Sequence, residues 1–199
     1  MNNDAPFHTF ESSDPAFLVS YVELRKRVFR LHYEGLAEDF GEADDTDLAS
    51  RIVYVFQGDR LAGAARLTVS TPENPCVLPL EDCGFRLRGY DALCDFELGR
   101  RPYGEISRMA VDPACSQGLA ASLCLAAGLC RVASALSVDT LFSICPPGAV
   151  RLNRRNAAAL GVMFRKFRNI STAYGREMSL CAFAGIVQVG TNLSCAFAA

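Results

Sequence analysis

The stretch YGEISRMAV, residues 103–111, decides the fold class together with the segment C-terminal to it. Its residues alternate as in a β-strand, and Asp112-Pro113 ends the pattern. The sequence then predicts an Ala- and Leu-rich helix at 116–137 and a strand at 138–145 that is apolar enough to be buried on both faces. A strand, a helix and a strand in this order predict a parallel pair joined by a crossover helix.

The N-terminal part of the chain predicts a helix followed by an antiparallel hairpin, because helical spacing of apolar residues gives way to β-branched and aromatic runs around a turn. The expected elements are a loose polar lead at 1–13, a helix at about 15–31, a short helix near 33–40, an acidic loop at 41–47, and strands at 51–56 and 61–70.

The remaining elements complete a mixed sheet. Residues 71–102 are a long irregular stretch, of a kind that is often functional in compact domains. A helix is expected at about 149–160, and strands at 161–170 and 177–189. We therefore predict one α/β domain over residues 1–199, with a mostly antiparallel sheet, a parallel central pair and helices on both faces.

Composition excludes several classes of protein. The net charge of −2 gives no reason to expect a nucleic-acid partner, because phosphate binding needs a basic face. The N-terminus lacks the basic and apolar regions of a signal peptide, so we expect a cytoplasmic protein. The most apolar run, Leu119 to Cys130, is shorter than the about twenty residues that a membrane span needs, and predicts a buried helix.

The nine cysteines form no CxxC pair, and the chain has only two histidines, so no metal site is expected. We expect these cysteines to be reduced thiols in the core. None is an obvious nucleophile, because no histidine lies near one in the sequence.

Candidate chemistry centres on Glu105, Ser107 and Arg108. Alternation along a strand puts Glu105 and Ser107 on one face and Arg108 on the other, unless a bulge intervenes. A carboxylate can accept the proton of an amine that attacks a thioester, and an Arg can bind the carboxylate of an amino acid. A structural ion pair within an apolar strand is the alternative.

Further charged residues precede this strand. Arg25 and Phe29 share one face of the first helix, Asp44 and Asp47 lie in the acidic loop, and Arg66 lies in the second hairpin strand. A solvated helix face for Arg25 and ordinary turn chemistry for the aspartates remain alternatives.

Four short segments resemble, in order, the motifs of acyl-homoserine-lactone synthases. They are LRKRVF at 24–29, DDTD at 44–47, ARL at 65–67 and EISRMAV at 105–111. That family belongs to the GNAT acyltransferase superfamily, so the resemblance implies a GNAT fold with a splayed parallel central pair. The chain has no tryptophan, however, where those synthases carry one after the VF pair.

The chain therefore resembles more closely the long-chain N-acyl amino acid synthases of the N-acyltyrosine type. The resemblance implies transfer of a fatty acyl group from the phosphopantetheine arm of an acyl carrier protein to an amino acid, with a lipid-like product and no permanently bound cofactor. Two alternatives stay open: an acyl-homoserine-lactone synthase that uses S-adenosylmethionine, and a non-catalytic GNAT domain that binds acyl carriers.

The resemblance also assigns roles. It implies Glu105 and Ser107 as catalytic; Arg25, Phe29, Asp44, Asp47, Arg66 and Arg108 as substrate-binding; and Met109, Ala110, Val111, Gly118, Leu119 and Ala120 as binding the acyl-pantetheine arm. In the GNAT pyrophosphate loop Cys115 stands where a Gln or Arg is usual, which suits a carrier-borne donor; an ordinary helix start at Gly118 is the alternative.

Two further features have open interpretations. The basic residues of 151–168 are either a docking face for an acidic carrier protein or a solvated helix face. Apolar residues of 71–102, such as Phe85 and Leu87, either wall an acyl tunnel or belong to the core.

Overall fold

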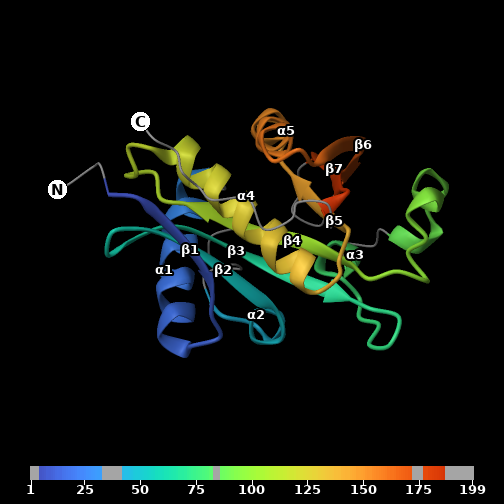
Figure 1. Ribbon diagram of the computed structural model, residues 1–199, viewed down its shortest axis with the longest axis horizontal. Helices are drawn as coiled ribbons and strands as arrows, with labels where there is room; N and C mark the ends of the chain where they lie inside the picture. The colour runs from blue at the N-terminus through green and yellow to red at the C-terminus, as the bar shows by residue number, and fades with distance from the viewer. Residues whose placement is uncertain (1–4, 33–41, 83–85, 172–176, 187–199) are drawn as a thin grey trace. The chain divides into compact units, whose positions relative to one another are not determined.

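Strand pairing follows the order β1-β2-β3-β4-β5-β7-β6 in a computed structural model that describes residues 5–32, 42–82, 86–171 and 177–186 (Figure 1). The β4–β5 pair is parallel and joins Gly104 to Leu141 and Glu105 to Phe142. The β1–β2, β2–β3, β5–β7 and β6–β7 pairs are antiparallel. The predicted mixed sheet with a parallel pair is confirmed. The helix expected near 33–40, and Phe85, lie outside the described residues.

The described residues group into two compact units, one drawn from 1–67 and 108–129 and the other from 68–107 and 130–190. Strands β3 and β4 and helix α4 contribute residues to both units. The assignment of residues 1–199 to a single domain stays a prediction.

The first unit is built on β1, β2 and most of β3. Its elements are β1 (Phe7–Glu11), α1 (Pro15–His32), α2 (Asp45–Ala49), β2 (Arg51–Gln57), β3 (Arg60–Ser70), the end of β4 (Tyr103–Val111) and most of α4 (Gly118–Ala135). The expectation of a loose lead at 1–13 is wrong, because Phe7–Glu11 pairs with β2. This strand is half-exposed and ends the pairing order, so its sequence carries little apolar alternation.

Helices cover both faces of the strands in the first unit. On one face, Tyr21 of α1 packs with Ile52, Tyr54 and Ala64. On the other face, α4 approaches so closely that a Cβ added at Gly128 would lie 2.8 Å from Val53 Cγ1. The alternation of side chains along β2 therefore places Tyr54 and Val53 against different helices.

The second unit contains the stretch that the sequence left irregular and the C-terminal strands. Its elements are α3 (Pro79–Asp82), the 3₁₀ turns η1 (Leu87–Gly89) and η2 (Asp91–Phe96), the start of β4, the end of α4, β5 (Thr140–Cys145), α5 (Ala149–Ala159), β6 (Met163–Ser171) and β7 (Glu177–Ala184). The expected helix at 149–160 and the strands that flank it are confirmed to within a few residues.

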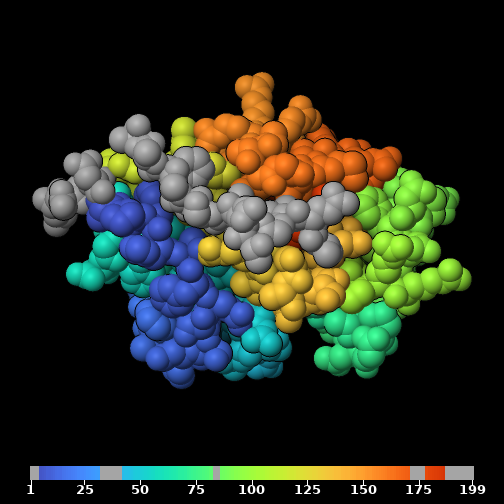
Figure 2. Space-filling model, in the orientation of Figure 1, coloured from blue at the N-terminus to red at the C-terminus, as the bar shows by residue number. Residues whose placement is uncertain are grey.

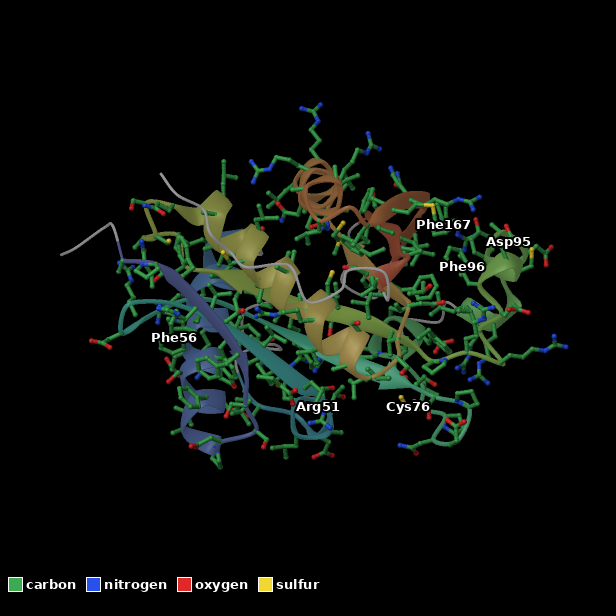
Figure 3. The ribbon with its side chains drawn as sticks, in the orientation of Figure 1. Arg51, Phe56, Cys76, Asp95, Phe96 and Phe167 are labelled. Atoms are coloured by element: carbon green, nitrogen blue, oxygen red, sulfur yellow. The ribbon has the colours of Figure 1, made fainter. Side chains whose placement is uncertain are left out.

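Two layers of apolar side chains lie on opposite faces of the strands in the second unit. Leucines of the stretch before β4 pack with Phe142 of β5 and with Leu180 of β7. Phe96 contacts both Phe142 and Phe167, with ring centroids 5.7 and 6.0 Å apart (Figure 3). On the other face, Cys145 and Cys181 pack with Val150 of α5. Leu87 is 1 % exposed and belongs to the first of these layers.

Helix α4 is the one helix of the described residues that is long and apolar enough to cross a membrane by length and composition. Half of this window is buried inside the protein. The run from Leu119 to Cys130 includes many fully buried side chains, among them Ala121, Leu125 and Leu129. Its apolar character is explained by this burial, so the prediction of a buried helix agrees with the structure.

Candidate active site

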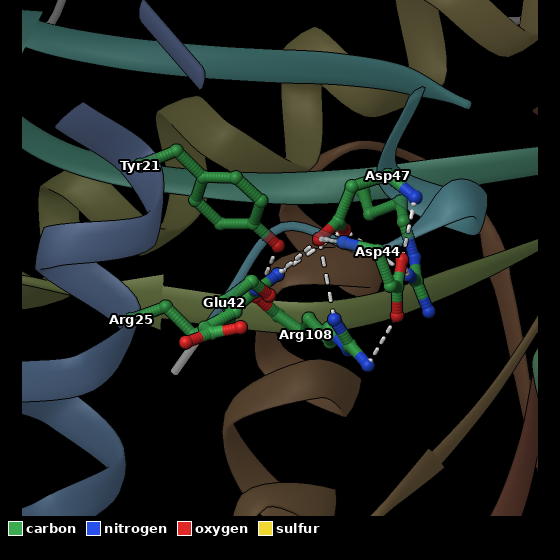
Figure 4. Close-up of polar contacts among 7 residues, drawn as sticks. Tyr21, Arg25, Glu42, Asp44, Asp47 and Arg108 are labelled. Atoms are coloured by element: carbon green, nitrogen blue, oxygen red, sulfur yellow. Dashed lines mark hydrogen bonds and ion pairs between the residues drawn. The ribbon is translucent and has the colours of Figure 1, made fainter. Parts of the chain in front are cut away.

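The centre of the candidate site in the first unit is Arg25, which is fully buried on α1. Its Nη1 donates to both carboxylate oxygens of Asp47, at 3.1 and 2.9 Å, and its Nη2 donates to the carbonyl oxygen of Glu42 (Figure 4). The guanidinium carbon lies 5.1 Å from the centroid of the Tyr21 ring. A solvated helix face is therefore wrong for Arg25, since the residue lies on the buried face with Tyr21 and Leu24.

Asp44 and Asp47 are held by the start of the short helix α2. Asp44 Oδ1 accepts the backbone N–H of Asp47 at 2.7 Å, and Asp47 Oδ2 accepts the backbone N–H of Asp44 at 3.2 Å. These reciprocal bonds form a capping box. The two aspartates therefore both cap the helix and form ion pairs, and the capping box fixes the positions of their carboxylates.

Two more arginines bind the same carboxylates from neighbouring strands. Arg66 of β3 places Nη1 3.0 Å from Asp47 Oδ1 and 3.1 Å from Asp44 Oδ1. Arg108 of β4 places Nη1 3.2 Å from Asp47 Oδ2 and Nη2 2.6 Å from Asp44 Oδ2 (Figure 4). Side chains of α1, α2, β3 and β4, with the residue that caps α2, thus form one cluster, which we call the charge cluster: Arg25, Asp44, Asp47, Arg66 and Arg108.

The backbone of Arg108 explains how this side chain reaches the charge cluster. Its φ of 49° is in the left-handed region, which is unusual for a non-glycine residue inside a strand. Such a residue is typical of a β-bulge, the interruption that the sequence required if Arg108 was to leave the regular alternation. The carbonyl oxygen of Arg108 accepts a hydrogen bond from the Tyr21 hydroxyl at 2.8 Å, so α1 supports the strained residue.

Burial and charge shift the pKa values of this cluster. Burial, opposed by the field of Arg25, raises the pKa of Tyr21 to about 12. For Asp44, burial is outweighed by the Asp47 N–H and the surrounding arginines, so the pKa of this carboxyl lies below its usual value. Burial, with Arg66 and Arg25 nearby, lowers the pKa of the Arg108 guanidinium. Asp44 is therefore ionised at neutral pH.

Access to the charge cluster differs among its members. The side chains of Arg25 and Asp47 are 0 % exposed, whereas those of Arg108 and Asp44 are 14 % and 39 % exposed. The Arg108–Asp44 pair is therefore the part of the cluster that a solute can reach. Phe29, by contrast, packs against the buried group formed by Leu24, Val28 and Ala110.

Glu105 belongs to the second unit and is 1 % exposed. Its Oε2 accepts the backbone N–H of Leu80 at 2.7 Å. A hydrogen bond from a backbone N–H to a carboxylate is charge-assisted and favours the ionised form, which is the form that can accept a proton. Ser107, two residues further along β4, is half-buried.

The loop between β4 and α4 is organised by Asp112. The carboxylate accepts the N–H of Ala114 at 3.0 Å and pairs with Arg60 at 2.7 Å. Helix α4 then begins at Gly118. Of the residues predicted to bind the pantetheine arm, Ala110 is 1 % exposed and in the core, while Leu119 is 60 % exposed. Met109, Val111, Gly118 and Ala120 are half-buried.

Neither a protein-family model nor a curated protein sequence matches the chain. Solved structures do. FeeM, an N-acyl amino acid synthase from uncultured soil microbes, is 16 % identical with a TM-score of 0.59, covering 92 % of this chain and 93 % of FeeM. The AHL synthase LasI is 18 % identical with a TM-score of 0.61 (91 % and 89 % covered). The CoA-dependent acyl-homoserine lactone synthase BjaI is 18 % identical with a TM-score of 0.59 (93 % and 87 % covered).

The fold is that of the GNAT acyltransferases. At these identities the likeness shows the fold alone. The structures that share it include both classes that the four sequence motifs resemble, the N-acyl amino acid synthases and the acyl-homoserine-lactone synthases.

Sequence reasoning missed Leu80, whose backbone N–H donates to Glu105, and its neighbour Glu81. Glu81 is 6 % exposed, and its carboxylate accepts the N–H groups of Leu78 and Leu87. The signal present in the sequence was Pro79 followed two residues later by Glu81, which is typical of the first turn of a helix.

The seven described cysteines are free thiols. Four are buried as expected, namely Cys124, Cys130, Cys145 and Cys181. Cys76 and Cys94 are exposed and Cys115 is half-buried, so a core position is wrong for these three. Within the described residues, no three His, Cys, Asp or Glu side chains lie together as metal ligands would.

Proposed function

We propose that this chain is an N-acyltransferase that moves a long-chain fatty acyl group from an acyl carrier protein to the amine of an amino acid, with tyrosine as the expected acceptor. The observation that carries the proposal is the charge cluster. In this cluster, α1, α2, β3 and β4 bring together one or more residues from each of the four motifs that resemble those of acyl-homoserine-lactone synthases. The GNAT fold of the chain supports the same reaction class.

Arg108 is the residue that we assign to the carboxylate of the acceptor. Its guanidinium is planar, is partly accessible and is aimed by two aspartates. Arg25, Asp47 and Arg66 are buried and keep this arrangement rigid. The partly exposed Asp44 lies beside Arg108 and keeps its guanidinium in this orientation.

Glu105 is the residue that we assign to proton transfer. It takes a proton from the acceptor ammonium, directly or through a water molecule. The neutral amine then forms a C–N bond to the thioester carbonyl carbon. When the tetrahedral intermediate collapses, the C–S bond breaks, the nitrogen gives up the proton that it still has to lose to become an amide, and the leaving pantetheine thiolate takes up this proton. Backbone N–H groups near Met109 to Val111 would hold the developing oxyanion and the pantetheine arm. The reaction needs no enzyme-bound acyl intermediate.

The acyl chain requires an apolar site. The aromatic and aliphatic layer of the second unit, which contains Leu87, Phe96 and Phe142, supplies side chains of this kind. We propose that the acyl chain inserts along this layer. The longest acyl chain that the enzyme accepts is then set by how far these side chains can move apart.

A carrier protein is favoured as the donor by the basic surface of α5 and β6. No acidic residue occurs in the sequence between Asp139 and Glu177, and Arg151, Arg154, Arg155, Arg165, Lys166 and Arg168 lie in this interval. Side chains of α5 project from the top of the view in Figure 2. Acyl carrier proteins are acidic, so charge complementarity supports docking here. The proposed enzyme acts in the cytoplasm on soluble carrier thioesters.

Product analysis tests the proposal. Purified protein is incubated with fatty acyl carrier thioesters, free amino acids and S-adenosylmethionine, and the lipid products are identified by mass spectrometry. An N-acyl amino acid is expected. A homoserine lactone would instead establish the S-adenosylmethionine-dependent reaction, and carrier binding without turnover would establish a non-catalytic domain. Replacing the carrier thioester by the coenzyme A thioester tests the donor, since the carrier is expected to be preferred.

A further inference from the structure

We propose that Glu81 is a positioning residue for Glu105, acting through the backbone N–H of Leu80. The inference rests on the proposed role of Glu105 in acyl transfer. All residues involved belong to the second unit. They link the stretch that precedes β4 to the carboxylate that we assign to proton transfer.

The first link is the bond from the Leu80 N–H to Glu105 Oε2, which is 2.7 Å long. Leu80 is 0 % exposed and Glu105 is 1 % exposed, so water does not compete freely for this bond. The donor holds one carboxylate oxygen in a fixed direction and stabilises its negative charge.

The geometry of α3 explains why this N–H is available. Leu80 is the second residue of α3, and N–H groups in the first turn of a helix have no acceptor within the helix. A Ser, Thr, Asp or Asn before the helix normally supplies a side-chain oxygen. Here Leu78 occupies that position, and its side chain has no oxygen. Glu105 supplies the missing acceptor from β4.

The second link is the carboxylate of Glu81, which fixes the turn that aims Leu80. Its Oε2 accepts the N–H of Leu78 at 3.1 Å, and its Oε1 accepts the N–H of Leu87 at 3.2 Å. The backbone N–H of Glu81 donates to the carbonyl oxygen of Leu78 at 2.7 Å. The side-chain bond to Leu78 is one half of a capping box, and the bond to Leu87 ties the turn to the next segment.

Glu81 is itself buried, and a buried carboxylate is unfavourable unless its oxygens accept hydrogen bonds. Both of its oxygens do so from backbone groups. Loss of this carboxylate removes the acceptors of two buried N–H groups at once. The turn between them then loosens, and Glu105 loses a donor of fixed direction. Glu81 thus acts on the reaction without contacting the reacting atoms.

The test compares Glu81→Gln with Glu73→Gln in the acyl-transfer assay. Glu81→Gln is nearly isosteric, but its amide nitrogen cannot accept an N–H bond. Glu73 is exposed in the same stretch and serves as the matched control. We expect Glu81→Gln to lower kcat by about tenfold with an unchanged KM for the acyl donor. The acidic limb of the kcat/KM profile is expected to move up by about one pH unit, because ionised Glu105 is less stabilised. Glu73→Gln is expected to behave as wild type.

If Glu81 has only a structural role, Glu81→Gln reduces thermal stability but leaves the acidic limb of the kcat/KM profile at its wild-type pH. That result overturns the proposal. Glu81→Asp, which keeps the charge but shortens the reach, is the second variant if the first does not fold, with the same expected shift. Amide hydrogen exchange gives an independent measurement. Exchange at Leu80 is expected to be faster in either variant, and unchanged exchange overturns the proposal. This measurement holds even if the wild-type protein shows no acyl transfer, which would refute the proposed function alone.

Discussion

Arg25 and Asp47 form a buried ion pair in which one guanidinium nitrogen binds both carboxylate oxygens, at 3.1 and 2.9 Å, and both side chains are 0 % exposed. Asp47 also binds Arg66 and Arg108. One carboxylate on a five-residue helix thus holds guanidiniums from α1, β3 and β4. The charge cluster depends on this shared carboxylate more than on any single arginine.

Replacement of Asp47 is expected to destabilise the protein strongly. Asp47→Asn keeps the size of the side chain but removes the charge that three arginines share. Breaking a buried pair by neutralising one partner leaves uncompensated buried charge, and we expect a loss of about 3–5 kcal/mol in the free energy of unfolding. Urea-induced unfolding, followed by circular dichroism at pH 7, measures this loss.

Asp45→Asn is the control for this measurement, because Asp45 lies on the same short helix and outside the buried ion pairs. Its substitution is expected to change the free energy of unfolding by less than about 0.5 kcal/mol. Equal stability of the two variants would show that the buried ion pair does not support the fold.

Glu105→Gln is expected to lower kcat for acyl transfer by about 10²-fold, because an amide cannot accept the proton of the acceptor amine. The KM for the acyl donor should change little, since the substitution keeps size and shape. Initial rates across about pH 5–9, the range in which general acid–base groups titrate, measure both parameters. A kcat of Glu105→Gln near the wild-type value at every pH would exclude Glu105 as the base. Glu73→Gln is the control, because it removes an exposed carboxylate elsewhere in the second unit.

Much of the fold was predictable, because periodicity reports which faces of an element are buried. The strand at 103–111, the long helix after it and the parallel pair are all expected from alternation and apolar runs. Several short elements were not predicted, among them β1, α2 and α3. β1 pairs at the end of the strand order and shows little alternation, and α2 is a five-residue helix defined by its capping box. Local pattern is weak for elements of this length.

The candidate site was predictable only as a set of residue types. A single sequence identifies Arg25 and Asp47 as candidates but does not show that they form an ion pair. The alternative that Arg25 lies on a solvated helix face could therefore not be excluded from the sequence. The sequence shows that Arg108 needs a bulge to reach the face of Glu105. It does not predict that the bulge forms, because the left-handed residue is an arginine and not the glycine or asparagine that is usual there. Glu81 was missed because its partners are backbone groups of Leu78 and Leu87, which residue types do not identify; Pro79 and Glu81 indicate only the first turn of a helix.

The basic surface gives a prediction about the donor. Arg151 and Arg154 are exposed on α5. The double variant Arg151→Ala/Arg154→Ala is expected to lower kcat/KM for the acyl carrier by about tenfold, to weaken its dependence on salt and to leave kcat unchanged. Turnover of the coenzyme A thioester should not change, because that donor carries no protein to dock. Steady-state kinetics at two ionic strengths measure all of these effects.

Arg30→Ala is the control for the basic surface, because Arg30 is an exposed arginine of α1. An equal effect of this control on the carrier reaction would indicate general attraction by net charge. An unchanged carrier reaction in the double variant would place the docking surface elsewhere.

Asp112 links stability to pH. Burial opposes its ionisation, but the N–H of Ala114 and the guanidinium of Arg60 lower the pKa of this carboxyl below its usual value. A carboxyl with a lower pKa in the folded than in the unfolded chain stabilises the fold when it is ionised. This contribution is complete above the unfolded pKa, which is about 4, and is lost as the pH falls through the folded value.

We therefore expect Asp112→Asn to be less stable than wild type at pH 7, and the difference to shrink as the pH falls below about 4. Denaturant unfolding at about pH 7, 4 and 3 measures the difference. Asp59→Asn is the matched control, since Asp59 is exposed in the turn between β2 and β3, and its difference from wild type should stay small at every pH. The difference in the free energy of unfolding between wild type and Asp112→Asn could instead stay constant over this range. The carboxyl would then stabilise the fold through its hydrogen-bond geometry and not through its charge. The bond to the Ala114 N–H would then matter for the loop before α4 more than the ion pair with Arg60.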